Sequence, residues 1–407
     1  MRSTRLLSIL QLRSFFISYS KVVAATTTSL PVKSVVEYPL PAAAETHEIL
    51  PVSDSLLLIS QQTDGGLIKI SLNENGQPTG SQKYIITDQW SGIHGLALHA
   101  ETGSTGNYSG PTVWATLQFD NAILQIDPKG NDISQRPEII KTIAIPAPAF
   151  GPHGILESKG NLWVACKDSS HIVRISIKDP SDHQVWAVSG RPIFVAVHPT
   201  SGDVFSGLDL SSRIWHYEND GGNGEEISIP QEKGTTPVGL IAGADGNAWF
   251  VLLGDATAGT GTFARINKDA SIDYFTMTTT LGHHAPLIHL AFDQDPRRFW
   301  VLGSSTVCPS CPDAVFTVEI DDLSTKGTAS PRIKIQNTIM MPTQRSWNHR
   351  IMSHRGSLYV SELKTSTLAH LSGAAVNGLK ISEKWDQFPD WGLGLRAQGI
   401  EYNNTIY

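Results

Sequence analysis

The sequence predicts an all-β protein, a single β-propeller of four-stranded blades, and three observations lead to this fold class. One pattern recurs roughly every 40 to 60 residues: a Gly-Ile or Gly-Leu step, an aromatic residue after a short gap, and an Ile-x-x-Ile run. The 35 Gly and 23 Pro residues are scattered between apolar runs, as many tight turns require. Helical periodicity is poor throughout. Short strands repeated at a fixed spacing are typical of a propeller.

The clearest copy of the pattern runs from Gly151-Pro-His-Gly-Ile155 through Asn161-Leu-Trp-Val164 to His171-Ile-Val-Arg-Ile175. We assign these segments to the first, second and third strands of a blade. A more polar fourth strand follows, of which Lys141-Thr-Ile-Ala-Ile145 in the preceding repeat is an example. Seven near-complete copies predict seven blades, with six or eight as the alternatives.

The two ends of the repeat series indicate how the ring closes. Residues 35–40 read as a fourth strand with no repeat before it, and residues 397–402 read as a first strand with little after it. We expect the N-terminal strand to complete a blade begun near the C-terminus. Such closure removes the exposed strand edges that an open ring would leave.

The first thirty residues differ in composition from the rest. Arg2, Arg5, Arg13 and Lys21 carry the only charges, and no acid precedes Glu37. A basic, partly apolar start favours a secretory signal, with an organelle transit segment as the rival. We therefore divide the chain into a leader, residues 1–30, and a propeller domain, residues 34–407, and expect a protein of the secretory pathway or a secreted one.

Composition limits the classes of partner. The net charge is −7 and no basic block occurs, which argues against nucleic acid, because phosphate binding needs clustered Lys and Arg. Beyond the leader, no stretch is long and apolar enough to predict a membrane span. The expected partner is a small molecule.

Three cysteines are too few for a disulfide framework. We interpret Cys308-Pro-Ser-Cys311 as a local disulfide or two exposed thiols; half of a zinc site is the alternative, although no second Cys/His pair lies nearby at ligand spacing. Cys166 ends an apolar strand and is predicted to be a small core residue.

Specific motifs carry a resemblance to a known family. Pro152-His-Gly-Ile155, Gly160-Asn-Leu-Trp-Val164 and Ile172-Val-Arg-Ile175 together resemble the virginiamycin B lyase (streptogramin lyase) propellers, and are similar to the wider regucalcin- and gluconolactonase-like propellers. The resemblance covers most of the chain after about residue 34. It implies a metal-assisted enzyme in which His and Glu near the central channel open a cyclic ester by elimination.

The best local match to that family is Trp347-Asn-His-Arg350 followed by Ser357-Leu-Tyr-Val-Ser-Glu362. Glu362 takes the last position of the family's Leu-Trp-Phe-Thr-Glu-like strand, where we read Ser60, Cys166 and Gly303 in other repeats. The family's full set of acidic ligands is missing, so we assign no metal ligand.

The chain as a whole, with its leader and decorated propeller, also resembles a narrower group. These are fungal natural-product enzymes that perform an intermolecular hetero-Diels–Alder reaction, joining a tropolone-derived o-quinone methide to a humulene-type sesquiterpene. This resemblance implies a cyclase that needs no cofactor.

One repeat position collects histidines. The residue just before the Gly of each first strand should face the central axis, and in the successive copies it reads His47, His94, His153, Ile193, Val238, Leu287, His349 and Gln398. A polar arc would then lie opposite an apolar arc. Imidazole can donate or accept a hydrogen bond and can titrate near neutral pH, so a shared reaction site is expected. The alternative is a structural histidine copied with the repeat. We predict as catalytic residues His47, His94, His153, His349 and Glu362.

Aromatic and further polar residues near the first strands are the candidates for binding a substrate. Flat apolar faces suit a conjugated ligand or a terpene. These candidates are Trp90, Phe150, Trp347, Trp391, Gln398, His284 and His289. The aromatics that recur on second strands, Trp114 among them, are assigned to packing between blades.

Three functions remain open from the sequence. The favoured one is a cofactor-independent hetero-Diels–Alder cyclase of natural-product biosynthesis. The first alternative is a metal-dependent lyase or lactonase centred on His349, Glu362 and a divalent ion. The second is a propeller that binds a protein or glycan without catalysis.

Overall fold

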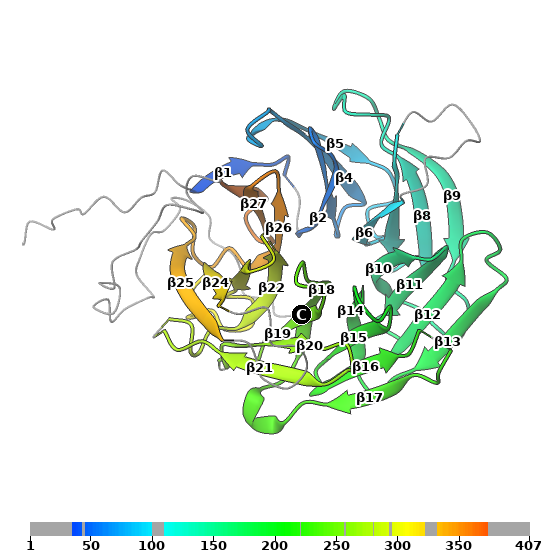
Figure 1. Cartoon of the computed structure of the whole chain (residues 1–407). Coiled ribbons are helices and arrows are strands. Elements are labelled where there is room, and N and C mark those ends of the chain that lie inside the picture. Colours follow the sequence, from blue (N-terminus) through cyan, green and yellow to red (C-terminus); the bar gives the residue numbers. More distant parts are fainter. Residues whose placement is uncertain are drawn as a thin grey trace, which may run out of the picture. The chain divides into compact units, whose positions relative to one another are not determined.

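The computed structural model describes residues 35–42, 45–99, 110–219, 221–255, 258–279, 281–292, 295–321 and 332–372. These residues form seven four-stranded antiparallel sheets, and each sheet is one blade of a ring around a central axis (Figure 1). The predicted all-β, seven-bladed propeller is confirmed. The leader, residues 1–30, and the expected strand at 397–402 lie outside the described residues.

Each blade is built from strands that follow one another in the chain. Blades 1 to 3 contain β2 (Thr46–Ser53), β3 (Leu56–Gln61), β4 (Gly66–Leu72) and β5 (Pro78–Ile85); β6 (Ile93–His99), β7 (Thr112–Leu117), β8 (Ala122–Asp127) and β9 (Glu138–Ala144); and β10 (Pro152–Ser158), β11 (Asn161–Cys166), β12 (His171–Ser176) and β13 (His183–Ala187).

Blades 4 to 6 repeat this order, and a short 3₁₀ helix, Gln231–Lys233, follows blade 4. They contain β14 (Arg191–Val197), β15 (Val204–Asp209), β16 (Arg213–Tyr217) and β17 (Glu225–Ser228); β18 (Pro237–Ala242), β19 (Ala248–Leu252), β20 (Thr262–Ile266) and β21 (Ile272–Thr276); and β22 (Leu287–Phe292), β23 (Arg298–Gly303), β24 (Ala314–Ile320) and β25 (Ile333–Met340).

Blade 7 is completed by the first strand of the chain. It consists of β26 (Asn348–His354), β27 (Ser357–Glu362), β28 (Thr367–Leu371) and β1 (Val35–Pro39). β1 pairs with β28 in antiparallel register, from Val35 opposite Leu371 to Pro39 opposite Thr367. Glu37 strengthens this junction by accepting hydrogen bonds from the backbone N–H and the hydroxyl of Thr343, at 2.8 and 2.7 Å. Closure by the N-terminal strand is therefore confirmed.

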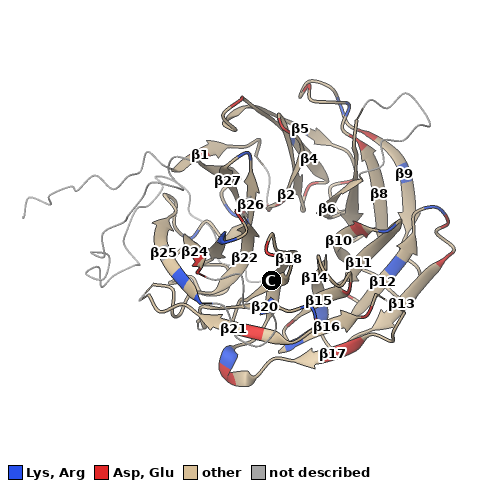
Figure 2. Cartoon of the chain, viewed as in Figure 1, with Lys and Arg blue, Asp and Glu red and all other residues tan. Residues whose placement is uncertain are grey.

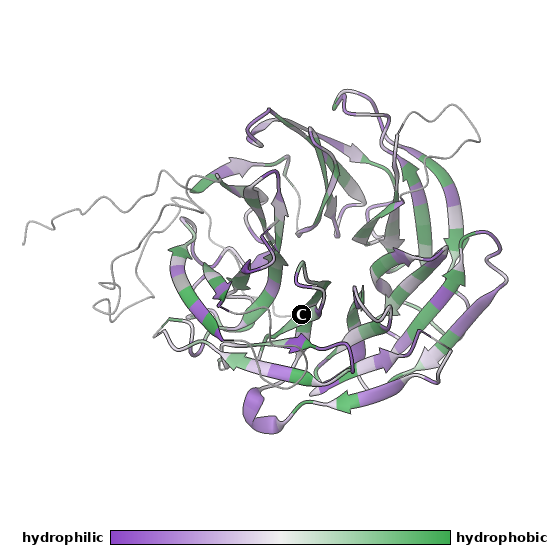
Figure 3. Ribbon diagram, in the orientation of Figure 1, coloured by the Kyte–Doolittle hydropathy of each residue, from purple (hydrophilic) through white to green (hydrophobic). Residues whose placement is uncertain are grey.

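The core lies between neighbouring blades and is made largely by the second strands. Every residue of β3, β7 and β27 is buried. The recurring aromatics of these strands, such as Trp114, Trp249 and Tyr359, are fully buried. Trp249 packs against Phe299 of the next blade, with ring centroids 4.9 Å apart. Packing between blades, as predicted for these aromatics, is confirmed, and Figure 3 shows apolar and polar positions alternating along the strands.

Charged residues lie mainly on the outer strands and loops. Figure 2 shows charged residues on β12, β17, β21 and β25, whereas the inner strands β6, β18 and β22 carry none. One inner-blade cation is fully buried: the Lys69 ammonium donates to the carbonyl oxygens of Pro128, Gly130 and Asp132, at 2.7, 3.1 and 2.5 Å. This contact fixes a loop of blade 2 against blade 1.

The cysteines take structural positions. Cys308 and Cys311 form a disulfide in the loop between β23 and β24, in agreement with the local disulfide predicted as one of the two forms. Cys166 is buried at the end of β11, where burial raises the pKa of its thiol, as expected of a core residue. The described part of the chain contains no helix with the length and apolarity of a membrane span.

Candidate functional site

The first strand of each blade is irregular close to its beginning. Its pairing with the second strand shifts register there, between Thr46 and Ile49 in blade 1, for example, and between Asn348 and Arg350 in blade 7. Such bulges re-aim the residues that they contain. In six blades the residue after the first paired position is His47, His94, His153, Val238, Ile288 or His349. In blade 4 the equivalent residue is Ile193, which follows the second paired position, Pro192.

One equivalence made from the sequence was wrong. Leu287 had been aligned with the histidines, but it pairs with Gly303 just as Thr46 pairs with Gln61, so the equivalent residue in blade 6 is Ile288. The sequence suggested that Pro286 matches Pro152 and Pro192, but in blade 6 the paired position is held by Leu287, one residue later. His289 occupies the next position along β22.

The glycines after two of the histidines are required by close approach of the neighbouring blade. A Cβ on Gly95 would lie 2.4 Å from the backbone oxygen of His153, and one on Gly154 would lie 2.3 Å from that of Ile193. Neither contact is sterically possible. The Gly step in the sequence thus marks the places where adjacent first strands touch.

Hydroxyl groups on the second strands connect these bulges around the ring. The Thr116 hydroxyl accepts from the N–H of Gly95 at 2.8 Å and donates to the carbonyl of His153 at 2.8 Å. Ser60 bonds in the same way to the N–H of Glu48 and the carbonyl of His94. Each hydroxyl joins its own first strand to the first strand of the following blade. The backbone at the histidines is therefore held by buried hydrogen bonds.

The four histidine side chains meet at the axis. The ring centroids of His47 and His94 are 3.7 Å apart, those of His94 and His153 are 3.4 Å apart, and those of His47 and His349 are 4.0 Å apart. His47, His94 and His153 are only 4%, 1% and 4% exposed. Histidines from four consecutive blades, numbers 7, 1, 2 and 3, thus form one packed cluster, which we call the imidazole cluster.

Several ring nitrogens of the imidazole cluster have no hydrogen-bond partner. They are Nδ1 of His47, Nδ1 of His94 and both nitrogens of His349. His153 is different, because its Nδ1 lies 3.1 Å from the carbonyl oxygen of Ile193. A carbonyl only accepts, so Nδ1 of His153 carries the proton and Nε2 keeps the lone pair.

The imidazole cluster is electrically neutral at neutral pH. Burial, as the largest cause, lowers the pKa of His47, His94, His153 and His349 well below the usual value of 6.5. The Arg350 guanidinium acts in the same direction on all four. The Lys167 ammonium further lowers the pKa of His47, His94 and His153, and neighbouring imidazoles further lower the pKa of His94, His153 and His349. These imidazoles can therefore donate an N–H or offer a lone pair, but they do not store a proton, in contrast to the titrating role expected from the sequence.

Apolar residues occupy the same position in the other three blades. Ile193, Val238 and Ile288 are 7%, 5% and 4% exposed, and they belong to blades 4, 5 and 6. The ring at this level accordingly has one polar arc of four blades and one apolar arc of three.

Arg350 connects the two arcs. Its Nε donates to the carboxylate of Glu48 at 3.0 Å, and its guanidinium lies 4.4 Å from the ring centroid of Phe194 in blade 4. The side chain is 3% exposed. The next position of blade 6 holds His289, whose ring is 5.5 Å from Phe194 and whose pKa is lowered by burial to about 3. Arg350 and Glu48 are thus a buried ion pair beside the imidazole cluster.

Glu362 does not join the imidazole cluster. In the described chain its carboxyl accepts hydrogen bonds from the hydroxyls of Thr365 and Thr367 and faces Glu37 of β1. The preceding residue, Ser361, bonds toward the axis, and successive strand residues point to opposite faces, so Glu362 points away from it. The residue that matches Ser60 is Ser361, and Glu362 matches Gln61, which corrects the alignment made from the sequence.

Burial and the charge of Glu37 raise the pKa of Glu362 to about 8. The carboxyl is fully buried, and its Oε1 has no hydrogen-bond partner. This environment belongs to the closure between β1 and β28 and not to the axis.

The other predicted binding residues are spread over the loops. Trp90 and Phe150, 70% and 48% exposed, precede the first strands of blades 2 and 3. Trp347 lies just before β26, where its ring is covered by the Lys364 ammonium at 3.3 Å. His284 lies in the turn before β22, beside His283. Trp391 and Gln398 lie outside the described residues.

Sequence reasoning missed the polar residues that follow the second strands. Gln62 donates to the side-chain oxygen of Gln118 at 3.0 Å, and Gln118 donates to the carboxylate of Asp168 at 3.0 Å, which links blades 1, 2 and 3. Lys167 is adjacent to Asp168 and acts electrostatically on His47, His94 and His153. Gln62, Gln118 and Lys167 share one signal in the sequence, because each is the first residue after a second strand, and Asp168 follows directly.

The donor set does not fit the divalent ion of the alternative function. Among the described residues, no group of three or more His, Cys, Asp or Glu side chains is placed to hold a metal ion. His349 and Glu362 diverge, and Glu48 is engaged by Arg350. The imidazoles of His47, His94 and His153 pack directly against one another, with centroids 3.7 and 3.4 Å apart.

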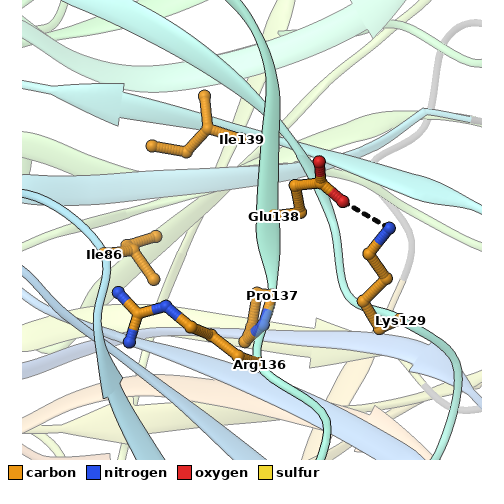
Figure 4. Close-up of a pocket in the computed structure, with 6 residues that line it drawn as sticks. All are labelled: Ile86, Lys129, Arg136, Pro137, Glu138 and Ile139. Carbon is orange, nitrogen blue, oxygen red and sulfur yellow. Dashed lines mark ion pairs between the residues drawn. The ribbon is translucent and has the colours of Figure 1, made fainter.

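Two surface hollows lie away from the imidazole cluster. One, of about 320 Å³, is lined by side chains of blades 1 and 2, where Lys129 pairs with Glu138 at 2.5 Å (Figure 4). The other, of about 370 Å³, lies between blades 3 and 4 at the opposite strand ends from the histidines and includes Trp163 and Tyr217. We assign no role to either.

Comparison with known proteins places the fold. No protein family matches the chain by sequence, and no curated protein does. Among solved structures, a streptogramin B lyase has a TM-score of 0.61 at 16% identity, covering 83% of this chain and 96% of its own. A catalytically inactive virginiamycin B lyase from Staphylococcus aureus, solved with quinupristin, has a TM-score of 0.61 at 18% identity, covering 83% and 98%.

Other structural neighbours have different functions. YCF48 bound to a D1 peptide has a TM-score of 0.55 at 14% identity, covering 84% of this chain and 96% of its own. At such identities the likeness extends to the fold alone. The chain is a seven-bladed β-propeller similar in fold to virginiamycin B lyase.

Proposed function

We propose that this chain is an enzyme that acts on a small molecule at the imidazole cluster, where neutral imidazoles stabilise negative charge on a substrate oxygen. The observation that carries the proposal is the contact of four histidines from four consecutive blades, three of which keep buried ring nitrogens without a partner. Unpaired buried polar atoms cost stability, and proteins tolerate such costs at functional sites.

The chemistry available to the imidazole cluster is hydrogen-bond donation in a site of low polarity. A neutral N–H pointed at a carbonyl oxygen stabilises the charge that develops on that oxygen in the transition state. Because burial keeps the rings neutral, the N–H is present throughout the neutral pH range. No step of this kind needs a redox group or a metal.

The reaction that we propose is the intermolecular hetero-Diels–Alder cyclisation implied by the narrower resemblance. The oxygen and the exocyclic carbon of an o-quinone methide form one C–O and one C–C bond with an alkene, three π bonds become one, and no atom leaves. The carbonyl oxygen of the quinone methide would accept from the imidazole N–H. Holding the two reactants together converts a bimolecular reaction into an effectively unimolecular one.

The division of the axial residues into a polar arc and an apolar arc supports the binding of two chemically unlike reactants. The polar arc, with His47, His94 and His153, suits the oxygen-bearing diene. The apolar arc, with Ile193 and Val238, suits a hydrocarbon partner such as a sesquiterpene alkene. A metal-dependent lyase centred on His349 and Glu362 has less support, because these two side chains point to different regions.

The solved lyase structures add one supporting analogy. In the Staphylococcus aureus virginiamycin B lyase, replacement of a histidine by alanine gives a catalytically inactive protein. Histidine chemistry on a propeller of this fold therefore has a precedent, although the identity to this chain is only 18%.

The test is a reconstituted reaction with wild type, His94→Gln and His153→Gln. The purified chain receives a tropolone o-quinone methide precursor and a humulene-type alkene, and the adduct is measured by liquid chromatography with mass detection. We expect each variant to lose at least about 100-fold in rate while its circular dichroism is unchanged. His183→Gln, an exposed histidine of blade 3, is the matched control and should react like wild type.

Two results would overturn this function. One is wild-type adduct formation no faster than the uncatalysed reaction. The other is an unchanged rate in both His94→Gln and His153→Gln. Ring opening of a cyclic ester that stops on metal chelation would point to the lyase instead.

A further inference from the structure

A lysine without a partner lies beside the imidazole cluster. Lys167 directly follows β11, and its backbone N–H donates to the carbonyl of Gly151 at 2.9 Å, which fixes it next to the start of β10. Its side chain is half-buried, and it makes no ion pair or side-chain hydrogen bond within the described residues. A partly desolvated ammonium that makes no ion pair or side-chain hydrogen bond is costly, which makes it a candidate for binding an anion.

The acidic groups around Lys167 are engaged elsewhere. Asp168 accepts from Gln118 at 3.0 Å. Asp209 forms an ion pair with Arg191 and also accepts from the N–H of Leu210 at 2.8 Å. Glu45 is the remaining nearby carboxyl, and burial raises its pKa. The positive charge at Lys167 is thus not neutralised by an ion pair.

Lys167 is unique among its equivalents. In the other six blades the matching residue is neutral or acidic: Gln62, Gln118, Asp209, Leu253, Ser304 and Leu363. The position therefore does not require a cation for folding. The lysine beside the polar arc is therefore particular to this one blade.

Exposed apolar side chains collect at the same strand ends as Lys167. Trp90 and Phe150 precede first strands, and Phe119 and Leu210 follow second strands; they are 70%, 48%, 53% and 73% exposed. The backbone of Phe150 exchanges two 2.9 Å hydrogen bonds with the hydroxyl of Ser169, which links it to the loop that carries Lys167. We call these four residues the apolar rim. Large apolar side chains that are exposed on one face of a fold are suited to bind an apolar ligand.

We propose that Lys167 binds an oxyanion of the substrate and that the apolar rim contacts the rest of it. The ligand class is a conjugated oxyanion, such as a carboxylate, phenolate or enolate, attached to an apolar body. This inference rests on the proposed function in one respect, that the imidazole cluster is the reaction centre. Lys167 would then orient the oxygen-bearing reactant above the polar arc, as a specificity residue.

The experiment measures binding of two probes of the same shape, one anionic and one neutral. 2-Naphthoate is a conjugated anion on an apolar body, and 2-naphthamide is its neutral counterpart. Isothermal titration calorimetry at pH 7 and low salt should give wild type at least a tenfold preference for the anion, or about 1.4 kcal/mol. Lys167→Met should remove the preference, and Lys167→Arg should retain most of it.

The matched control is Lys159→Met, a lysine of the same blade at the opposite strand ends, which should keep the wild-type preference. Phe150→Ala should weaken the binding of both probes equally, because this substitution removes only apolar contact. Equal binding of both probes to wild type, or an unchanged preference in Lys167→Met, would overturn the inference.

The outcomes separate this inference from the proposed function. Probe binding needs no turnover, so charge selectivity lost in Lys167→Met supports the inference even if His94→Gln reacts like wild type. Loss of turnover in His94→Gln together with equal binding of both probes would leave the function standing and remove Lys167 from it.

Discussion

The hydroxyl of Ser60 donates a 2.6 Å hydrogen bond to the backbone carbonyl of His94, so one blade holds the histidine of the next. The same hydroxyl accepts from the N–H of Glu48 at 3.1 Å. Thr116 and Ser361 repeat this arrangement in blades 2 and 7. The backbone at His94, His153 and His47 is thus held by a hydroxyl of the preceding blade.

Replacing the hydroxyl of Ser60 should lower the stability of the folded protein. Ser60→Ala leaves a buried carbonyl and a buried N–H without their partner, so we expect a loss of about 1–3 kcal/mol in the free energy of unfolding. Urea denaturation measures it. Ser71→Ala, which removes an exposed hydroxyl pair with Thr79, should cost less than about 0.5 kcal/mol. Equal effects of the two substitutions would contradict the bridging role.

Stability should fall as the pH drops below about 6.5, the ordinary histidine value. The histidines of the imidazole cluster have lowered pKa values when folded, so between those values and 6.5 the unfolded chain binds more protons than the folded one. Each such histidine lowers the free energy of unfolding by up to about 1.4 kcal/mol for each pH unit of this drop. Urea midpoints from pH 8 to 5 measure this slope.

The matched variant for the pH series is His47→Gln, which removes one titrating ring. Its stability should decline less steeply than that of wild type between pH 6.5 and 5. His183→Gln, at an exposed position, should leave the slope unchanged. A slope identical in wild type and His47→Gln would show that this ring is charged in the folded protein.

Glu362 should make the stability of the protein depend on pH in the opposite direction, at higher pH. Its folded pKa is raised to about 8, so between the usual 4.5 and 8 the folded chain binds the extra proton and stability falls as the pH rises. Glu362→Gln never ionises. It should be more stable than wild type at pH 9, with a difference that shrinks toward pH 4.5.

The comparison of wild type with Glu362→Gln needs only denaturation at pH 5, 7 and 9. Glu37→Gln is the second variant, since it removes the neighbouring charge that helps to raise the pKa of Glu362. A Glu362→Gln protein less stable than wild type at pH 9 would mean that the ionised carboxylate is needed at the closure.

The fold could be predicted from the sequence because its signal is repeated. Gly95 and Gly154 appear in the sequence as a Gly step, since a neighbouring backbone leaves no room for a Cβ there. The convergence of His47, His94 and His153 followed from their shared position. Repetition therefore predicts both the ring and the residues that line its axis.

Features that occur only once were harder to predict. In blade 6 the Pro that precedes the first strand lies one residue earlier than in blades 3 and 4, and the assignment of Leu287 instead of Ile288 followed from that shift. The direction of Glu362 depends on strict alternation along β27, where an error of one position reverses the face. Lys167 occurs in a single blade and so left no repeated signal. The lowered pKa of the histidines depends on burial, which only the folded ring supplies.

The pairing of β1 with β28 has a consequence for biosynthesis. β1 is the earliest strand of the described ring to leave the ribosome, and β28 is the latest. Blade 7 therefore cannot be completed until translation of the whole propeller has finished. During that interval β1 has no neighbour, and unpaired strands are prone to aggregation. Nascent chains stalled before Leu371 should consequently depend on chaperones more than the finished ring does.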